Sequence, residues 1–143
     1  MEGEPIIEAV SDTAPRNHAG LRPTGARHRS LASLWLPVVV WAGLIFSLSS
    51  VPDLGTGLGG WDLVLRKLGH AAEYAVLGAL LARAVGRAWP AFALGLLYAI
   101  SDEAHQAFVP GRQGAPLDVT IDAVGVACGV LLWRSLARRR GGS

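Results

Sequence analysis

The sequence predicts an all-α protein, a polytopic membrane bundle of four transmembrane helices with both termini in the cytoplasm. Apolar segments recur along the chain, and arginine is concentrated in alternate connections between them. Hydrophobic residues make up 51% of the 143 residues and charged residues only 17%, against about 25% in ordinary soluble domains. We expect residues 31–140 to form one membrane domain. Residues 1–30, which combine prolines with charges of both signs, are expected to form a disordered tail.

The first apolar segment, Leu31 to Ser50, contains no charged residue over its length. At about 1.5 Å per residue, such a helix can cross a hydrocarbon core of about 30 Å. A cleaved signal peptide is the alternative, because small residues follow the apolar core. The segment is longer than a typical apolar signal core of about 7–15 residues, which favours a retained helix. Residues 51–65 are rich in glycine and predict a loop.

The second segment, Arg66 to Val85, is interrupted by charged residues, and helical spacing explains their pattern. Lys67, His70 and Tyr74 are separated by three and four residues and share one helix face, with Glu73 on its adjoining edge. Small residues form a second stripe that predicts close contact with a neighbouring helix: Ala71, Ala75, Gly78 and Ala82.

The third segment runs from about Trp89 to Phe108 and ends in polar residues. Asp102 and Gln106 are four residues apart and are therefore expected to face the same way. Residues 109–111 contain a Pro-Gly pair that ends the helix.

The fourth segment is predicted from Leu117 to Leu136. Asp118, Asp122, Gly125 and Gly129 form one stripe along it. The glycines have the GxxxG spacing, which serves dimerisation or packing within the chain equally well. The oligomeric state is therefore left open.

The distribution of arginine predicts the topology. Arginines precede the first segment, occupy the connection around residues 83–87 and end the chain, whereas residues 51–65 contain none. The positive-inside rule then places both termini in the cytoplasm. The polar ends of the second, third and fourth segments should consequently meet in the outer half of the bundle. An ionised side chain at the bilayer centre costs about 2.5–3.5 kcal/mol, so we expect these groups to pair or to line a wet cleft.

Three motifs occur in order: KLGHAAEYAVLG, YAISDEAHQAFVPGR and LDVTIDAVGVACG. In this combination the chain resembles the VanZ-like family of small integral membrane proteins over about residues 45–132. The resemblance implies a helical membrane protein of bacterial type, and the namesake of the family is linked to low-level resistance to the glycopeptide teicoplanin. The positions that match the motifs are Lys67, His70, Tyr74, Asp102, Glu103, Gln106, Phe108, Pro110, Arg112, Asp118, Asp122 and Gly125.

Two functions are compatible with this polar cluster. The first is a binding or protective protein, in which an outward cleft holds the headgroup of a cell-envelope lipid or alters the access of a glycopeptide to its target. The binding residues would be Lys67, Glu73, Tyr74, Gln106, Arg112, Asp118 and Asp122. The alternative is an intramembrane enzyme that acts on a lipid-linked envelope substrate by general acid/base chemistry, with Arg112 on a phosphate. The candidate catalytic residues are His70, Asp102 and Glu103.

Each of these residues also has a purely structural interpretation. Asp102 can belong to an ion-pair network that fixes helix register, and Arg112 can pair with Asp118. His70 with Glu73 can be a buried hydrogen-bonded pair.

No cofactor is expected, and no metal is assigned. The zinc motif HExxH is absent, and Glu103 and His105 point about 200° apart on a helix. A divalent ion on Asp102, Asp118 and Asp122 is conceivable, because hard cations prefer oxygen ligands.

The expected partner is the lipid bilayer, and a net charge of only +2 argues against nucleic acid as a partner. The single cysteine, Cys128, excludes an intramolecular disulfide and is expected to be packed in the core.

Overall fold

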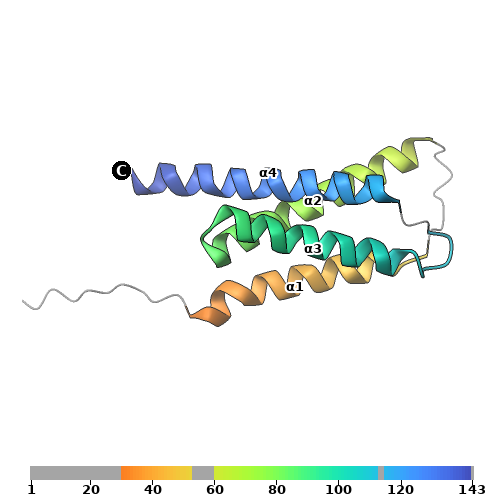
Figure 1. Cartoon of the computed structure of the whole chain (residues 1–143), viewed down its shortest axis with the longest axis horizontal. Coiled ribbons are helices and arrows are strands. Elements are labelled where there is room, and N and C mark those ends of the chain that lie inside the picture. Colours follow the sequence, from red (N-terminus) through yellow and green to blue (C-terminus); the bar gives the residue numbers. More distant parts are fainter. Residues whose placement is uncertain (1–29, 53–59, 113–114, 143) are drawn as a thin grey trace, which may run out of the picture.

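The computed structural model describes residues 30–52, 60–112 and 115–142. These residues form four α-helices and no strand, as predicted: α1 Leu31–Ser49, α2 Gly60–Val85, α3 Ala88–Gln106 and α4 Pro116–Gly141. Successive helices run in opposite directions, so α2 and α4 begin, and α1 and α3 end, at the same end of the bundle (Figure 1). The predicted tail, residues 1–30, lies almost entirely outside the described residues.

The helix boundaries differ from the predicted ones in three places. α2 begins at Gly60, inside the segment predicted as a loop, because Trp61 and the apolar residues after it continue the helix. α3 ends at Gln106, two positions before Phe108, since the amide of Val109 bonds the carbonyl of Gln106 in a tight turn at 3.0 Å. α4 continues through the arginine-rich end of the chain to Gly141.

The connection between α2 and α3 is short because one glycine reverses the chain. Gly86 has a φ of +73°, and its amide donates to the carbonyl of Ala82 at 3.0 Å, closing the end of α2. Residues with a Cβ rarely adopt this left-handed conformation. The turn places α2 and α3 side by side and antiparallel (Figure 1).

The most extensive helix contact joins α2 and α4, which run parallel. Gly125 and Gly129 of α4 lie directly against the backbone of α2. A Cβ on Gly125 would overlap the carbonyl oxygen of Ala71, and a Cβ on Gly129 would overlap that of Ala75. The GxxxG spacing therefore serves packing within the chain, and the predicted small-residue stripe of α2 forms the other half of the contact.

A small apolar core fills the space between α2, α3 and α4. Val126 of α4 is fully buried and fits against two glycines, Gly78 of α2 and Gly95 of α3. Tyr74 and Leu77 of α2 lie in the same cluster, which Val38 and Ile45 of α1 complete. α1 packs on α2 and α3 and does not reach α4.

The distribution of polarity is the reverse of that in a soluble domain. Exposed side chains on the outside of the bundle include Leu36, Val39, Val40, Leu97, Ile100, Leu131 and Leu132, whereas the buried polar side chains are Ser49, Asp102, Glu103, Gln106 and Asp122. By length and composition, α1 and α4 are apolar enough to cross a membrane. In the part of the chain that the structure describes, α2 and α3 do not meet that criterion.

The prediction for Cys128 was wrong. Its side chain is exposed on α4 instead of packed in the core. An apolar run in this bundle has an outward face as well as a core face, so apolar neighbours in the sequence do not imply burial.

We expect Gly129→Ala to destabilise the bundle by about 1–3 kcal/mol, because the new methyl group must push the α2 backbone away. The free energy of unfolding in mixed detergent micelles measures this effect. Gly43→Ala on α1 is the matched control, since nothing lies within 4 Å of the added atom. Equal stability of the two variants would show that α2 and α4 do not touch at Gly129.

Candidate functional site

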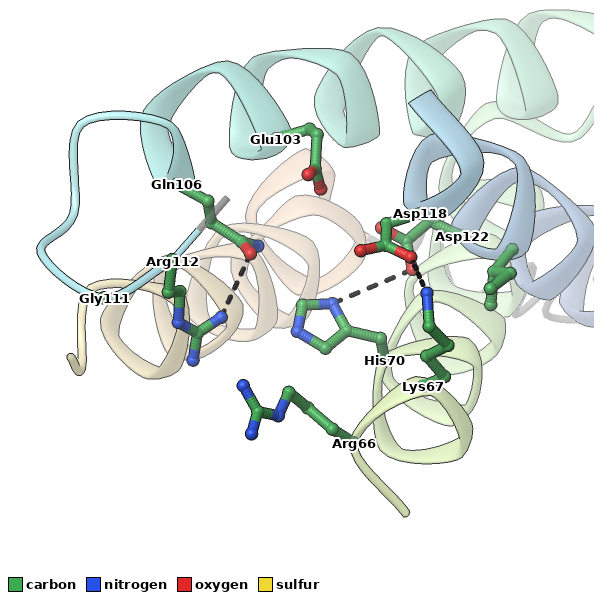
Figure 2. A pocket seen from close by; sticks show the side chains of 10 residues that line it. Arg66, Lys67, His70, Glu103, Gln106, Gly111, Arg112, Asp118 and Asp122 are labelled. Atoms are coloured by element: carbon green, nitrogen blue, oxygen red, sulfur yellow. Dashed lines mark hydrogen bonds and ion pairs between the residues drawn. The ribbon is translucent and has the colours of Figure 1, made fainter. Parts of the chain in front are cut away.

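A polar pocket of about 270 Å³ lies where α2, α3 and α4 meet at the end that carries the acidic residues (Figure 2). It unites the three polar clusters that the sequence places on separate helices. Its lining comprises Arg66, Lys67, His70, Glu103, Gln106, Gly111, Arg112, Asp118, Ile121 and Asp122.

Two pairs join the first turns of α2 and α4. The ammonium of Lys67 forms an ion pair with the carboxylate of Asp118 at the half-exposed rim. One turn deeper, Nδ1 of His70 lies 3.8 Å from Oδ1 of Asp122 (Figure 2). The Asp122 side chain is only 2% exposed, and neither of its carboxylate oxygens has a hydrogen-bond partner within the described part of the chain.

A second buried cluster joins α3 to the end of α1. Ser49 donates from Oγ to Oδ2 of Asp102 at 2.7 Å, and Gln106 donates from Nε2 to the same oxygen at 2.9 Å. Asp102 and Gln106 thus face the same way, as their spacing predicts. Nothing in the sequence singled out Ser49, because it is one of several serines at the end of the first apolar segment.

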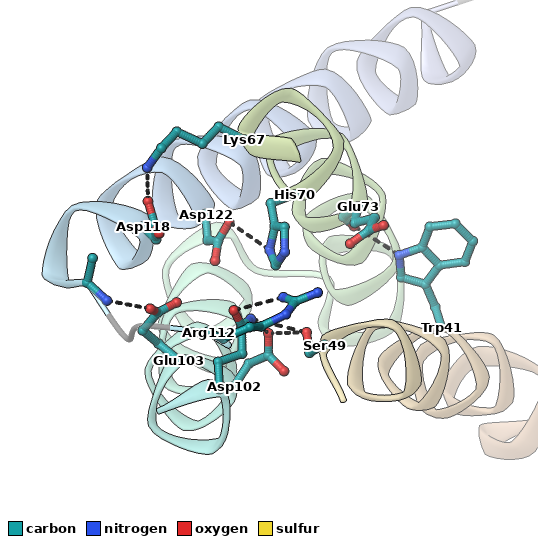
Figure 3. Close-up of polar contacts among 12 residues, drawn as sticks. Trp41, Ser49, Lys67, His70, Glu73, Asp102, Glu103, Arg112, Asp118 and Asp122 are labelled. Carbon is teal, nitrogen blue, oxygen red and sulfur yellow. Dashed lines mark hydrogen bonds and ion pairs between the residues drawn. The ribbon is translucent and has the colours of Figure 1, made fainter. Parts of the chain in front are cut away.

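Arg112 follows the turn after α3 and closes this cluster on the pocket side (Figure 3). Its guanidinium donates to the carbonyl oxygens of Val51 at 3.1 Å and Leu48 at 3.3 Å, and to Oε1 of Gln106 at 3.0 Å. All three acceptors are neutral. Among the described residues, no ion pair joins Arg112 to a carboxylate, so the alternative pairing with Asp118 does not occur.

Glu103 and His105 point to different sides of α3, as expected from their spacing. Glu103 lines the pocket, and its Oε1 accepts a hydrogen bond from the amide of Ala115 at 2.6 Å, which ties α3 to the start of α4. His105 stacks on Phe46 of α1 with ring centroids 4.4 Å apart.

Two predicted binding residues do not line the pocket. Glu73 lies on the side of α2 that faces α1, where its backbone carbonyl accepts a hydrogen bond from the indole of Trp41 at 2.9 Å (Figure 3). Tyr74 is fully buried beneath the pocket, between His70 and Tyr98.

The pocket lining also contains three residues that were not predicted as site residues: Arg66, Gly111 and Ile121. The sequence offered one indication of them, the position of Arg66 beside Lys67.

The candidate catalytic residues differ in whether their side chains can be reached from the pocket. His70 and Glu103 line the pocket, whereas Asp102 lies behind Gln106 and is bonded on Oδ2. The general acid/base role of these three residues remains a prediction.

The described residues contain no group of three or more His, Cys, Asp or Glu side chains that could hold a metal ion. The conceivable trio of Asp102, Asp118 and Asp122 is therefore not assembled.

Together, the fold and the site define a four-helix protein with an apolar exterior and a buried polar end. The family model described as VanZ/LLP1 matches residues 22–138, and the chain belongs to this family. The three motifs therefore predicted the family correctly. The family and the two apolar helices indicate a membrane protein. No curated protein and no solved structure matches the chain.

Ser49→Ala should cost about 1–3 kcal/mol of unfolding free energy, because it removes a donor from the buried carboxylate of Asp102. Chemical unfolding in mixed micelles measures the loss. Ser47→Ala is the control, since that exposed hydroxyl bonds only the carbonyl of Gly43 in its own helix. A Ser49→Ala variant as stable as Ser47→Ala would contradict the buried network.

Proposed function

We propose that the chain crosses the cell membrane four times, with both termini in the cytoplasm and the polar pocket facing outward. One observation supports this orientation, and a second supports the four crossings. The arginines at the opposite end, Arg83, Arg87, Arg134 and Arg138, line one cleft there, as the positive-inside rule requires of a cytoplasmic face. α3 carries its buried acidic groups, Asp102 and Glu103, at the pocket end, and the exposed positions of α2 and α3 include large apolar side chains.

Cysteine labelling tests this topology. In a Cys128→Ala background, Pro110→Cys reports on the pocket end and Gly142→Cys on the arginine-rich end; both positions are exposed. We expect a membrane-impermeant maleimide to label the Pro110→Cys variant in intact spheroplasts and the Gly142→Cys variant only after permeabilisation. The reverse pattern would overturn the orientation, and labelling of both from outside would overturn the even number of crossings.

The function that this site supports best is binding the headgroup of a cell-envelope lipid. The main support for this proposal comes from Arg112, whose positive charge faces the pocket and has no carboxylate partner in the described ranges. A guanidinium has five N–H donors in a planar fork that matches phosphate, and three of them suffice for the neutral acceptors. Since the pocket lies at the end of the bundle, a lipid can present its phosphate there while its acyl chains remain in the bilayer.

A bound headgroup at the outer surface would connect the site with glycopeptides. A protein that holds envelope lipids at that surface alters which headgroups are accessible beside it. We therefore propose that any effect on teicoplanin susceptibility is a consequence of lipid binding in the pocket.

The lipid that co-purifies in mild detergent tests the proposal. Mass spectrometry should find a phosphate-bearing lipid with the wild type, reduced at least about tenfold in Arg112→Met, because a charge-assisted contact is worth about 1.5–3 kcal/mol. Arg112→Lys, which keeps the charge and loses the fork, should fall in between. Arg134→Met removes one arginine at the other end and should retain the wild-type amount.

Thermal unfolding of each variant establishes that it is folded before lipids are compared. Equal lipid in folded wild type and folded Arg112→Met would contradict the proposed site. Susceptibility of a deletion strain is a separate readout: teicoplanin susceptibility equal to the parent's would remove the link to glycopeptides and leave lipid binding untouched.

A further inference from the structure

The pocket has two walls of opposite character. On the wall formed by α2 and α4, the carboxylate of Asp122 is enclosed, and both of its oxygens lack hydrogen bonds to any described residue. On the wall formed by α3 and the following turn, Arg112 presents its guanidinium, whose hydrogen bonds within the described part of the chain all go to neutral oxygens. His70 lies between them (Figure 2). One cavity therefore contains a buried carboxyl group without hydrogen-bond partners and a cation without an ion-pair partner, both judged among the described residues.

The two acidic residues of α4 differ in a way that matters for a ligand. Asp118 is already paired with the ammonium of Lys67, so its charge is balanced. Asp122, one turn deeper, has no ion-pair contact among the described residues other than the imidazole of His70, at 3.8 Å, beyond hydrogen-bond distance. A buried carboxylate without donors is costly, and a ligand that brings N–H donors and a positive charge relieves that cost.

We infer that the pocket selects a headgroup carrying both a phosphate and a primary ammonium group, the phosphoethanolamine class. This inference rests on the proposed lipid binding and specifies its ligand. The phosphate lies against Arg112, and the ammonium donates to Asp122. Phosphocholine has the same two charges but no N–H, so it cannot form the second contact. A phosphoglycerol headgroup lacks the positive charge altogether.

A methylation series on the wild-type protein tests the inference. The ligands are phosphatidylethanolamine, its N-methyl and N,N-dimethyl derivatives and phosphatidylcholine, all with the same acyl chains, presented in mixed micelles and measured by native mass spectrometry. We expect retention to fall along the series as donors are removed, to about tenfold lower for phosphatidylcholine than for phosphatidylethanolamine. Phosphatidylglycerol should be retained no better than phosphatidylcholine.

The Asp122→Asn variant provides a second test of the ammonium contact, because it keeps the shape of the side chain and removes its charge. The preference for phosphatidylethanolamine over phosphatidylcholine should disappear in this variant. Thr120→Val is the isosteric control on the same helix, since that exposed hydroxyl bonds the carbonyl of Pro116 and does not line the pocket. It should keep the wild-type preference.

The outcomes separate this inference from the function on which it rests. Equal retention of phosphatidylethanolamine and phosphatidylcholine, both dependent on Arg112, would overturn the ammonium contact and leave lipid binding in place. An undiminished preference in folded Asp122→Asn would do the same. Failure of every phosphate-bearing lipid to bind would remove the proposed function itself.

A competition experiment distinguishes a lipid from a soluble compound with the same headgroup. Free phosphoethanolamine at the concentration of the bound lipid should not displace it, because acyl chains add apolar contact with the outside of the bundle. Displacement at equal concentration would identify the soluble compound as the ligand and overturn the assignment to a lipid.

Discussion

The backbone contact between α2 and α4 is the constraint on which the rest of the structure depends. At Gly125 and Gly129 there is no room for a side chain between the helices, so their relative position is fixed at Ala71 and Ala75. Because the two helices run parallel from the same end, this contact also fixes what meets one or two turns earlier. Larger side chains in the contact would part the helices and widen the pocket above it.

The polar pairs at the pocket end follow from this register. His70 immediately precedes the contact on α2, and Asp122 lies one turn before it on α4, so they face each other across a short gap. Lys67 and Asp118 are one further turn away and meet at the rim. Close packing and a polar site are thus consequences of the same stripe of small residues.

α1 supports the site without lining it. The carbonyl of Leu48 lies at the end of α1, where it already accepts a hydrogen bond from the amide of Val51 at 3.2 Å. Arg112 donates to that oxygen and to the carbonyl of Val51, where a cation is also favoured by the helix dipole. This arrangement explains why Arg112 is stably held without a carboxylate, and why its charge stays available to the pocket.

The spacing of residues within one helix predicted which side chains share a face, and those predictions agree with the structure for Asp102 with Gln106 and for the glycine stripe. Spacing does not tell which neighbour a face meets. Glu73 is on the edge of the face that carries His70, yet it lies toward α1 and Trp41. Acceptors on the backbone, such as the carbonyl of Leu48, have no signature in the sequence at all. The sequence therefore predicted that the polar ends of the helices form the site. It did not predict which of these polar residues line the pocket and which hold the lining residues in place.

Hydropathy averaged over a whole helix and the polarity of its lipid-facing surface are different quantities, and α2 and α3 show the difference. The average of α3 is lowered by Asp102 and Glu103, which are buried among the helices, and that of α2 by charged residues such as Arg66 and Lys67, which line the pocket. Their outward positions, including Leu68 on α2 and Leu97 and Ile100 on α3, are large, apolar and exposed. A bilayer contacts only the outward positions, so a helix that fails an average can still present an apolar surface to lipid. This physical argument is why we propose four crossings where composition alone identifies two.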